Sequence, residues 1–336
     1  MRSRRLPLGP LPRKRRGRGL RGDGTRRRGR LLKLLGLAAA GAGLVYLATR
    51  DAEADEPTPA PPRPEPDADA AGLEAEEVGG RFVDGASGRI FVRSAGESGP
   101  ALMLVHGLGG SSAHWQAQLL ALGATCRVFA PDLRGHGRSE RAVDGSYEVK
   151  AHAADLLAVA DALGLDRFAL AGHSFGAWVA LELAATHPER ITALALVDPG
   201  GDTSAESPAA IETALATARE DPRSEFEQHY REFLHGAKPA TARRVLADLA
   251  ATSEDVLLTG LAEAMRYPAR ARLAAYPGPV ICLASPLNDT PGSLTRTVSG
   301  LVTEWLAPSS HWLMLDRPEQ TAGLLAELMQ KTRAGD

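Results

Sequence analysis

The stretch Phe168-Ala169-Leu170-Ala171-Gly172-His173-Ser174-Phe175-Gly176-Ala177 decides the fold. Its four leading apolar residues predict a buried β-strand, and the pattern from Ala177 to Thr186 predicts a helix. The glycines two positions before and two positions after Ser174 let the backbone turn sharply from strand to helix without Cβ clashes. Such a turn pushes the serine hydroxyl into the open at a helix N-terminus, and backbone strain of this kind persists where function needs it. The pattern therefore predicts a nucleophilic serine rather than a turn serine.

Short apolar runs alternate with longer helical patterns on both sides of this turn, which is typical of a mainly parallel sheet with helices on both faces. Residues 82–83 and 89–93 predict an opening hairpin. Further strands are predicted at residues 101–105, 127–130, 168–171, 193–197, 280–284 and 302–306, and helices at residues 149–163, 177–186 and 318–331. The period stays helical from Ser207 to about Leu273, which predicts a helical insertion between two strands.

Three further motifs, together with the serine turn, resemble the α/β-hydrolase family. The segment His106-Gly107-Leu108-Gly109-Gly110 resembles the family's loop after its third strand, and residues 132–139 (DLRGHGRS) are similar to the loop after the fourth. His311-Trp312 is similar to the segment that presents the catalytic histidine ahead of the last helix. The resemblance covers residues 80–333. It implies a mostly parallel eight-stranded sheet with helices on both faces and a helical cap, residues 201–275, inserted after the sixth strand.

A serine hydroxyl is a poor nucleophile at neutral pH, so it needs a base within hydrogen-bond reach and an acid that orients the base. The resemblance implies that His311 is this base. The chain order serine, acid, histidine places the acid between the two, at the end of a strand. Asp289 fits the family position, although Ser285-Pro286-Leu287-Asn288 departs from the family's usual glycine-containing turn. Asp198, which ends the strand at residues 193–197, is the alternative acid.

Two backbone N–H groups are needed to stabilise the oxyanion that develops during acyl transfer. By resemblance these are the N–H groups of Phe175 and Leu108. The other histidines are expected to shape loops (His106, His136 and His173) or to lie on the surface (His114, His152, His187, His229 and His235). We see no metal-ligand spacing, phosphate-binding loop or dinucleotide fingerprint, so no metal and no cofactor are expected.

These residues predict a serine hydrolase that cleaves a small carboxylic ester through an acyl-enzyme on Ser174, with lactones and thioesters as close relatives of that substrate. Two alternatives remain. Carbon–carbon bond hydrolases of the meta-cleavage-product type share this triad and a similar cap. The second alternative is a non-catalytic binding protein on the same fold, because a fold alone never proves activity.

Charge divides the chain into an N-terminal region and a folded body. Residues 1–33 hold fourteen Lys and Arg against Asp23, so the rest carries −15 although the net charge is only −2. The uncharged segment Leu34–Ala48 supports two interpretations, a cleaved signal peptide and a membrane anchor, and both place the body outside the cytoplasm. Residues 51–77 hold ten acids and many prolines, as in a solvated linker, before a hydrolase domain at residues 78–336. That body has no basic stripe with interleaved aromatics, which argues against a nucleic-acid partner.

Overall fold

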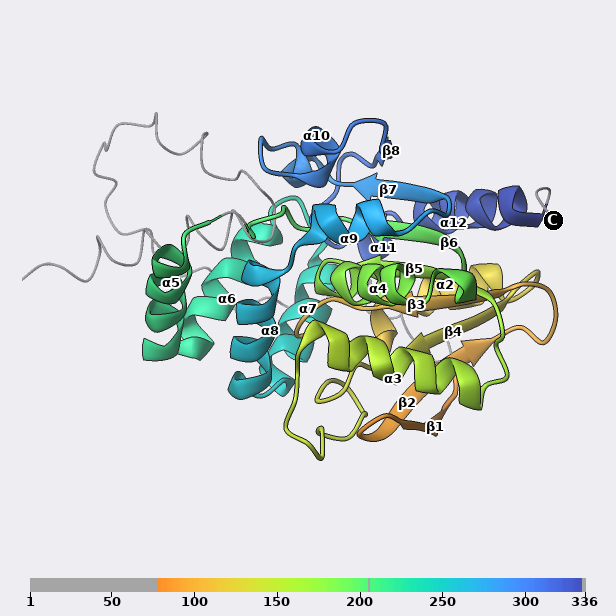
Figure 1. Ribbon diagram of the computed structural model, residues 1–336, viewed down its shortest axis with the longest axis horizontal. Helices are drawn as coiled ribbons and strands as arrows, with labels where there is room; N and C mark the ends of the chain where they lie inside the picture. Colours follow the sequence, from red (N-terminus) through yellow and green to blue (C-terminus); the bar gives the residue numbers. More distant parts are fainter. Residues whose placement is uncertain (1–77, 205, 334–336) are drawn as a thin grey trace, which may run out of the picture.

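The computed structural model describes residues 78–204 and 206–333, and these build one eight-stranded sheet (Figure 1). The strand order is β1-β2-β4-β3-β5-β6-β7-β8. β2 pairs antiparallel with β1 and with β4, and the remaining neighbours are parallel. The strands are β1 (Gly80–Gly85), β2 (Gly88–Ala95), β3 (Ala101–Val105), β4 (Arg127–Pro131), β5 (Phe168–His173), β6 (Ile191–Val197), β7 (Val280–Ala284) and β8 (Val302–Trp305). The predicted mostly parallel eight-stranded α/β sheet is confirmed.

Helices cover both faces of this sheet. α2 and α12 pack with one another on one face, while α3, α4 and α9 pack on the other. Outside the stretch between β6 and β7, the helices are α2 (Gln116–Leu122), α3 (Val149–Ala162), α4 (Phe175–Thr186), α10 (Leu294–Thr297), α11 (Leu313–Asp316) and α12 (Pro318–Arg333). Short 3-10 turns lie at Ser112–Trp115, Pro188–Arg190 and Pro286–Asn288.

The central strand β3 has an apolar sequence throughout, and its burial on both faces of the sheet explains why. All five of its residues are buried. Leu102 and Leu104 belong to the core under α2 and α12, whereas Ala101, Met103 and Val105 belong to the core under α3 and α4. Successive side chains of a strand point to opposite faces, so a strand covered on both faces must be apolar at every position.

Five helices occupy the chain between β6 and β7, and we call them the helical insertion: α5 (Pro208–Glu220), α6 (Pro222–Phe233), α7 (Pro239–Ala251), α8 (Glu254–Arg266) and α9 (Ala269–Ala275). They fall within residues 201–275, the range expected for a cap. α5 to α8 gather at one end of the sheet, whereas α9 returns to pack against α4 (Figure 1). The single helical period of the sequence therefore corresponds to several short helices. Pro208, Pro222 and Pro239 each open one of them, where proline costs no hydrogen bond.

The segments predicted as a basic lead (residues 1–33), a signal or anchor (34–48) and an acidic linker (51–77) lie outside the described residues. Within residues 78–204 and 206–333, no helix combines the length and the hydropathy that crossing a membrane requires.

Candidate active site

Ser174 occupies the sharp turn between β5 and α4 that the sequence predicts. Its φ of 52° lies in the left-handed region, which is rare for residues with a side chain. A Cβ on Gly172 would lie 2.1 Å from the backbone oxygen of Gly176, and one on Gly176 would lie 2.3 Å from that of His106. Both positions therefore require glycine. The N–H of Ser174 donates to the backbone oxygen of Val197 at 3.0 Å, which fixes the turn to the end of β6.

His311 and Asp198 form a buried pair beside this turn. The His311 Nδ1 lies 2.6 Å from Asp198 Oδ2, and the exposed fractions of the two residues are 3% and 1%. Asp198 ends β6 with a φ of 45°, so this residue also has a strained backbone. Because a carboxylate only accepts hydrogen bonds, Nδ1 carries the proton and donates it, and Nε2 keeps its lone pair.

The loop after β7 supports the carboxylate of Asp198. The Ser285 N–H donates to Oδ1 at 2.6 Å, and the Ser285 hydroxyl donates to Oδ2 at 2.9 Å. The side-chain amide of Asn288 also donates to Oδ1, at 3.2 Å. These donors fix the buried carboxylate in position, which is what an orienting acid needs.

The preference for Asp289 as the partner of His311 is wrong in this structure. Asp289 is exposed and accepts from the Arg296 Nε at 2.6 Å. The 3-10 turn Pro286–Asn288 directs the buried Asn288 inward, to Asp198, and leaves the next residue facing solvent. The sequence carried a signal for this outcome, since the loop after β7 departs from the family's glycine-containing turn.

The loop that carries His311 is held by Asp316, a buried carboxylate whose role the sequence does not reveal. Asp316 accepts from the Ser310 N–H at 2.8 Å, from the Thr241 hydroxyl at 2.8 Å and from the Lys238 N–H at 3.1 Å. Thr241 belongs to α7 and Lys238 precedes it. One side chain therefore joins the histidine loop to the helical insertion.

The two groups expected to bind an oxyanion lie at the same pocket as Ser174. Phe175 is the first residue of α4, and the leading N–H groups of a helix have no partner within it. The Leu108 backbone oxygen accepts from the Tyr230 hydroxyl at 2.5 Å. A Cβ on Gly260 of α8 would lie 2.4 Å from the Leu108 side chain. The glycine-rich loop after β3 is thus held by two helices of the insertion.

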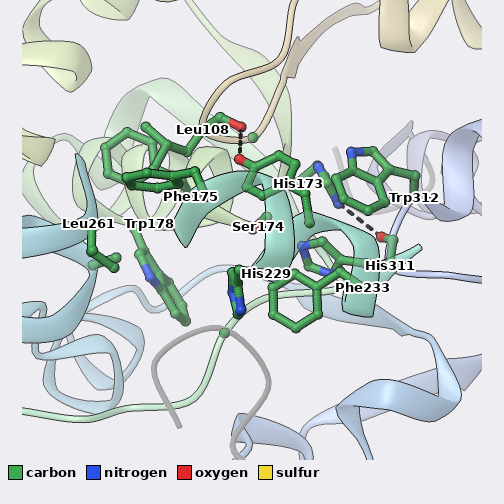
Figure 2. Close-up of a pocket in the computed structure, with 15 residues that line it drawn as sticks. Leu108, His173, Ser174, Phe175, Trp178, His229, Phe233, Leu261, His311 and Trp312 are labelled. Carbon is green, nitrogen blue, oxygen red and sulfur yellow. Dashed lines mark hydrogen bonds between the residues drawn. The ribbon is translucent and has the colours of Figure 1, made fainter. Parts of the chain in front are cut away.

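A pocket of about 620 Å³, including its opening to solvent, joins these groups (Figure 2). Among the described residues, no Asp, Glu, Lys or Arg lines the pocket, and the polar side chains that do are those of serine, tyrosine, tryptophan and histidine. The lining residues are Gly107, Leu108, His173, Ser174, Phe175, Trp178, Gly200, Phe226, His229, Tyr230, Phe233, Leu261, Ala264, His311 and Trp312.

Several histidines lie deeper than the sequence predicted. His106 accepts the Leu133 N–H at its Nε2, 2.9 Å away, in agreement with a loop-shaping role. Burial lowers its pKa to about 4 and that of His136 to about 3. The prediction of surface positions is wrong for three histidines, because each is at most 5% exposed: His114, His152 and His229. Among these, His229 lines the pocket, and residues of the insertion are the part of the site that the sequence could not assign.

Cys126 and Cys282 are both buried and free. Within the described part of the chain, no three His, Cys, Asp or Glu side chains are grouped so that they could hold a metal ion.

Residues 100–255 match the model of the α/β hydrolase fold family. This range contains the glycine-rich loop, the serine turn and Asp198. Together with the strand order described above, the match shows that the described residues have the α/β-hydrolase fold.

The chain is similar in part to several proteins named as hydrolases. RutD of Variovorax paradoxus (strain S110), provisionally named a carbamate hydrolase, is 42% identical over 119 residues, which are 35% of this chain and 45% of that protein. The 2-hydroxymuconate semialdehyde hydrolase of Pseudomonas sp. (strain CF600) is 37% identical over 125 residues, which are 36% of this chain and 44% of that protein. This chain thus spans less than half the length of either relative. Among solved structures, a hydrolase from Pseudomonas aeruginosa PA01 is similar with a TM-score of 0.64 and 26% identity, over 74% of this chain and 98% of that one.

Proposed function

We propose that the protein is a serine hydrolase that cleaves an uncharged carboxylic ester or lactone through an acyl-enzyme on Ser174. The observation that carries the proposal is the buried contact of 2.6 Å between His311 Nδ1 and Asp198 Oδ2, at a pocket that also contains Ser174 on its strained turn. Asp198, rather than Asp289, takes the role of the orienting acid.

The mechanism is a two-step acyl transfer. Asp198 holds His311 with its proton on Nδ1, so the Nε2 lone pair takes the proton of the Ser174 hydroxyl as Oγ bonds to the ester carbonyl carbon. The carbonyl oxygen gains the negative charge, and the N–H groups of Phe175 and Leu108 stabilise it. When the tetrahedral intermediate collapses, the bond to the leaving oxygen breaks and His311 gives that oxygen the proton. Water then attacks the acyl-enzyme in the same way and releases the acid and the free serine.

The pocket supports an uncharged, largely apolar substrate. Five aromatic side chains line it besides Phe175: Trp178, Phe226, Tyr230, Phe233 and Trp312. Binding a carboxylate there would require its desolvation without a cation among the lining residues, which is costly. This favours neutral esters and lactones over the ring-fission dienoates on which meta-cleavage-product hydrolases act, because those substrates carry a carboxylate.

The test is labelling of Ser174 by a fluorophosphonate probe, followed by hydrolysis of p-nitrophenyl esters of graded acyl length. We expect wild-type protein to be labelled and to turn over neutral esters, and Ser174→Ala to do neither while it keeps its circular dichroism spectrum. A Ser174→Ala variant with full esterase activity would refute the assignment. Hydrolysis of a dienoate ring-fission product in preference to every neutral ester would favour the carbon–carbon alternative. A wild-type protein that is neither labelled nor active would favour a binding protein.

We also propose that residues 1–48 direct the hydrolase domain to the outside of the cytoplasmic membrane. The basic residues 1–33 followed by the apolar segment Leu34–Ala48 support this, since positive charge stays on the cytoplasmic side. Ala52-Glu53-Ala54 offers a cleavage site, and the long basic lead favours a retained anchor. Protease protection in intact spheroplasts tests the location, and the mass of the exported protein distinguishes cleavage from anchoring. A domain that stays with the cytoplasmic fraction would refute the proposal.

A further inference from the structure

His229 lies on α6 of the helical insertion and faces the same pocket as Ser174. Only 5% of the residue is exposed. Its ring centroid lies 4.1 Å from that of Phe233, and the Phe233 ring lies 4.9 Å from the His311 ring (Figure 2). Phe233 therefore contacts both imidazoles, and His229 lies one aromatic ring away from the candidate base.

Within residues 78–204 and 206–333, the Nδ1 of His229 is buried and has no hydrogen-bond partner. A buried polar atom without a partner costs about 1–3 kcal/mol. A phenylalanine would fill the same apolar surroundings without that cost, so packing alone does not account for a histidine here. His229 is one of the residues that line the pocket, so a molecule bound there lies beside its imidazole.

The imidazole of His229 is a neutral group. Burial, assisted by the nearby His311, lowers its pKa to about 3. The other groups that pack on this ring are Phe233 and Tyr230, and Tyr230 directs its hydroxyl to Leu108. A neutral imidazole offers one N–H donor and one nitrogen acceptor. It can bind an uncharged carbonyl or hydroxyl, but it supplies no charge with which to attract a carboxylate.

The contacts of His229 do not favour a role as a second general base. The Phe233 ring stands between His229 and His311, and His311 already has its orienting carboxylate. No carboxylate accompanies His229 among the residues that line the pocket. The geometry instead favours contact with a part of the substrate that does not react.

We propose that His229 is a specificity-determining residue that hydrogen-bonds to an uncharged polar group of the substrate, a few bonds away from the scissile ester. The preferred substrate is then an ester or lactone whose otherwise apolar acyl chain carries one ketone, amide or hydroxyl group. This inference rests on the proposed esterase function and adds the substrate class.

The experiment compares two pairs of substrates that differ by one carbonyl: p-nitrophenyl pentanoate with the 4-oxopentanoate, and p-nitrophenyl hexanoate with the 5-oxohexanoate. Wild-type protein should have the higher kcat/KM for the oxo ester in at least one pair. His229→Phe keeps a ring in place and removes both nitrogens. It should lower kcat/KM for that oxo ester by roughly two- to tenfold more than kcat/KM for the matched alkyl ester, the equivalent of one hydrogen bond.

Two controls separate recognition from packing. Phe226→Leu alters an apolar lining residue of the same helix and should change both esters of a pair by the same factor. His229→Asn keeps a donor and an acceptor, and should regain part of the preference for the oxo ester; this variant also serves if His229→Phe does not fold. Because the imidazole stays neutral, the ratio of the two kcat/KM values should be constant from pH 6 to pH 9.

The outcomes distinguish this inference from the proposed function. If wild-type protein hydrolyses both esters but neither pair shows a preference, or His229→Phe lowers both members of a pair equally, the role of His229 is overturned and the esterase assignment stands. If wild-type protein hydrolyses none of the four esters and Ser174 is not labelled, the proposed function itself fails.

Discussion

Replacing Asp198 by asparagine should remove almost all activity, and the hydrogen bonds around this carboxylate show why. Oδ1 accepts from the Ser285 N–H and from Asn288, while Oδ2 accepts from the Ser285 hydroxyl and from His311. An amide nitrogen at the Oδ1 position would face two donors, one of them a backbone N–H that cannot rotate. The asparagine will therefore place its oxygen there and its NH₂ group against His311.

That orientation reverses the tautomer of His311. Facing a donor, Nδ1 must become the acceptor, so the proton moves to Nε2, and Nε2 can no longer take a proton from Ser174. The equivalent change in a serine protease lowers kcat about 10⁴-fold, or about 5 kcal/mol in the barrier. We expect a loss of similar size here with little change in KM.

The assay is steady-state hydrolysis of a p-nitrophenyl ester, with the rate of fluorophosphonate labelling as a second readout, because both need the base. Asp289→Asn is the matched control: its carboxylate is exposed and pairs with Arg296, so its kcat should stay within about twofold, as expected for a surface pair. If Asp198→Asn keeps a tenth of the activity, or Asp289→Asn is the variant that fails, this assignment of the acid is refuted.

Three further predictions concern groups around the site. Tyr230→Phe removes the hydroxyl that donates to the Leu108 oxygen. We expect kcat to fall roughly two- to tenfold at unchanged KM, which is the effect of one hydrogen bond on the loop of Leu108. An unchanged kcat would show that this hydrogen bond does not position the loop. Gly176→Ala would press a Cβ to 2.3 Å from the His106 oxygen, so urea unfolding should reveal a loss of about 1–3 kcal/mol, whereas a loss below measurement error would contradict the close approach. The free energy of unfolding should also fall as the pH drops below about 6.5, by about 1.4 kcal/mol per pH unit for each buried histidine. Below that pH the histidine binds a proton in the unfolded chain, whereas in the folded chain it stays neutral until the pH nears its lowered pKa. A urea midpoint that stays constant from pH 7 to pH 5 would refute this account of the five buried histidines with lowered pKa values: His106, His136, His152, His173 and His229.

The sheet and the serine turn could be predicted from the sequence because both follow from local patterns. The apolar runs of β3 and β7 were bounded correctly, since a doubly covered strand must be apolar at every position. The turn at Ser174 was predictable because Gly172 and Gly176 stand where no side chain fits.

The places of Asp198 and His229 in the site depend on contacts between distant segments, which no local pattern encodes. Asp198 and Asp289 both follow a strand, and what separates them is the direction in which the loop after β7 folds. His229 was expected on the surface because it lies in a helical stretch outside the recognised motifs. In the structure, α6 packs against the loop that carries His311, and this contact between distant segments buries His229.

The helical insertion begins shortly after Asp198 and ends before β7, so the part of the molecule that we propose to select the substrate is one continuous stretch of the chain. Exchanging it for the equivalent stretch of another hydrolase should transfer substrate choice while Ser285 and Asn288, which lie beyond it, continue to hold the acid. Such a graft has to keep two hydrogen bonds of the insertion. The Tyr230 hydroxyl donates to the Leu108 oxygen, and the Thr241 hydroxyl donates to Asp316. A chimera without them would keep Ser174, His311 and Asp198 but lose the hydrogen bonds that hold the Leu108 loop and the His311 loop.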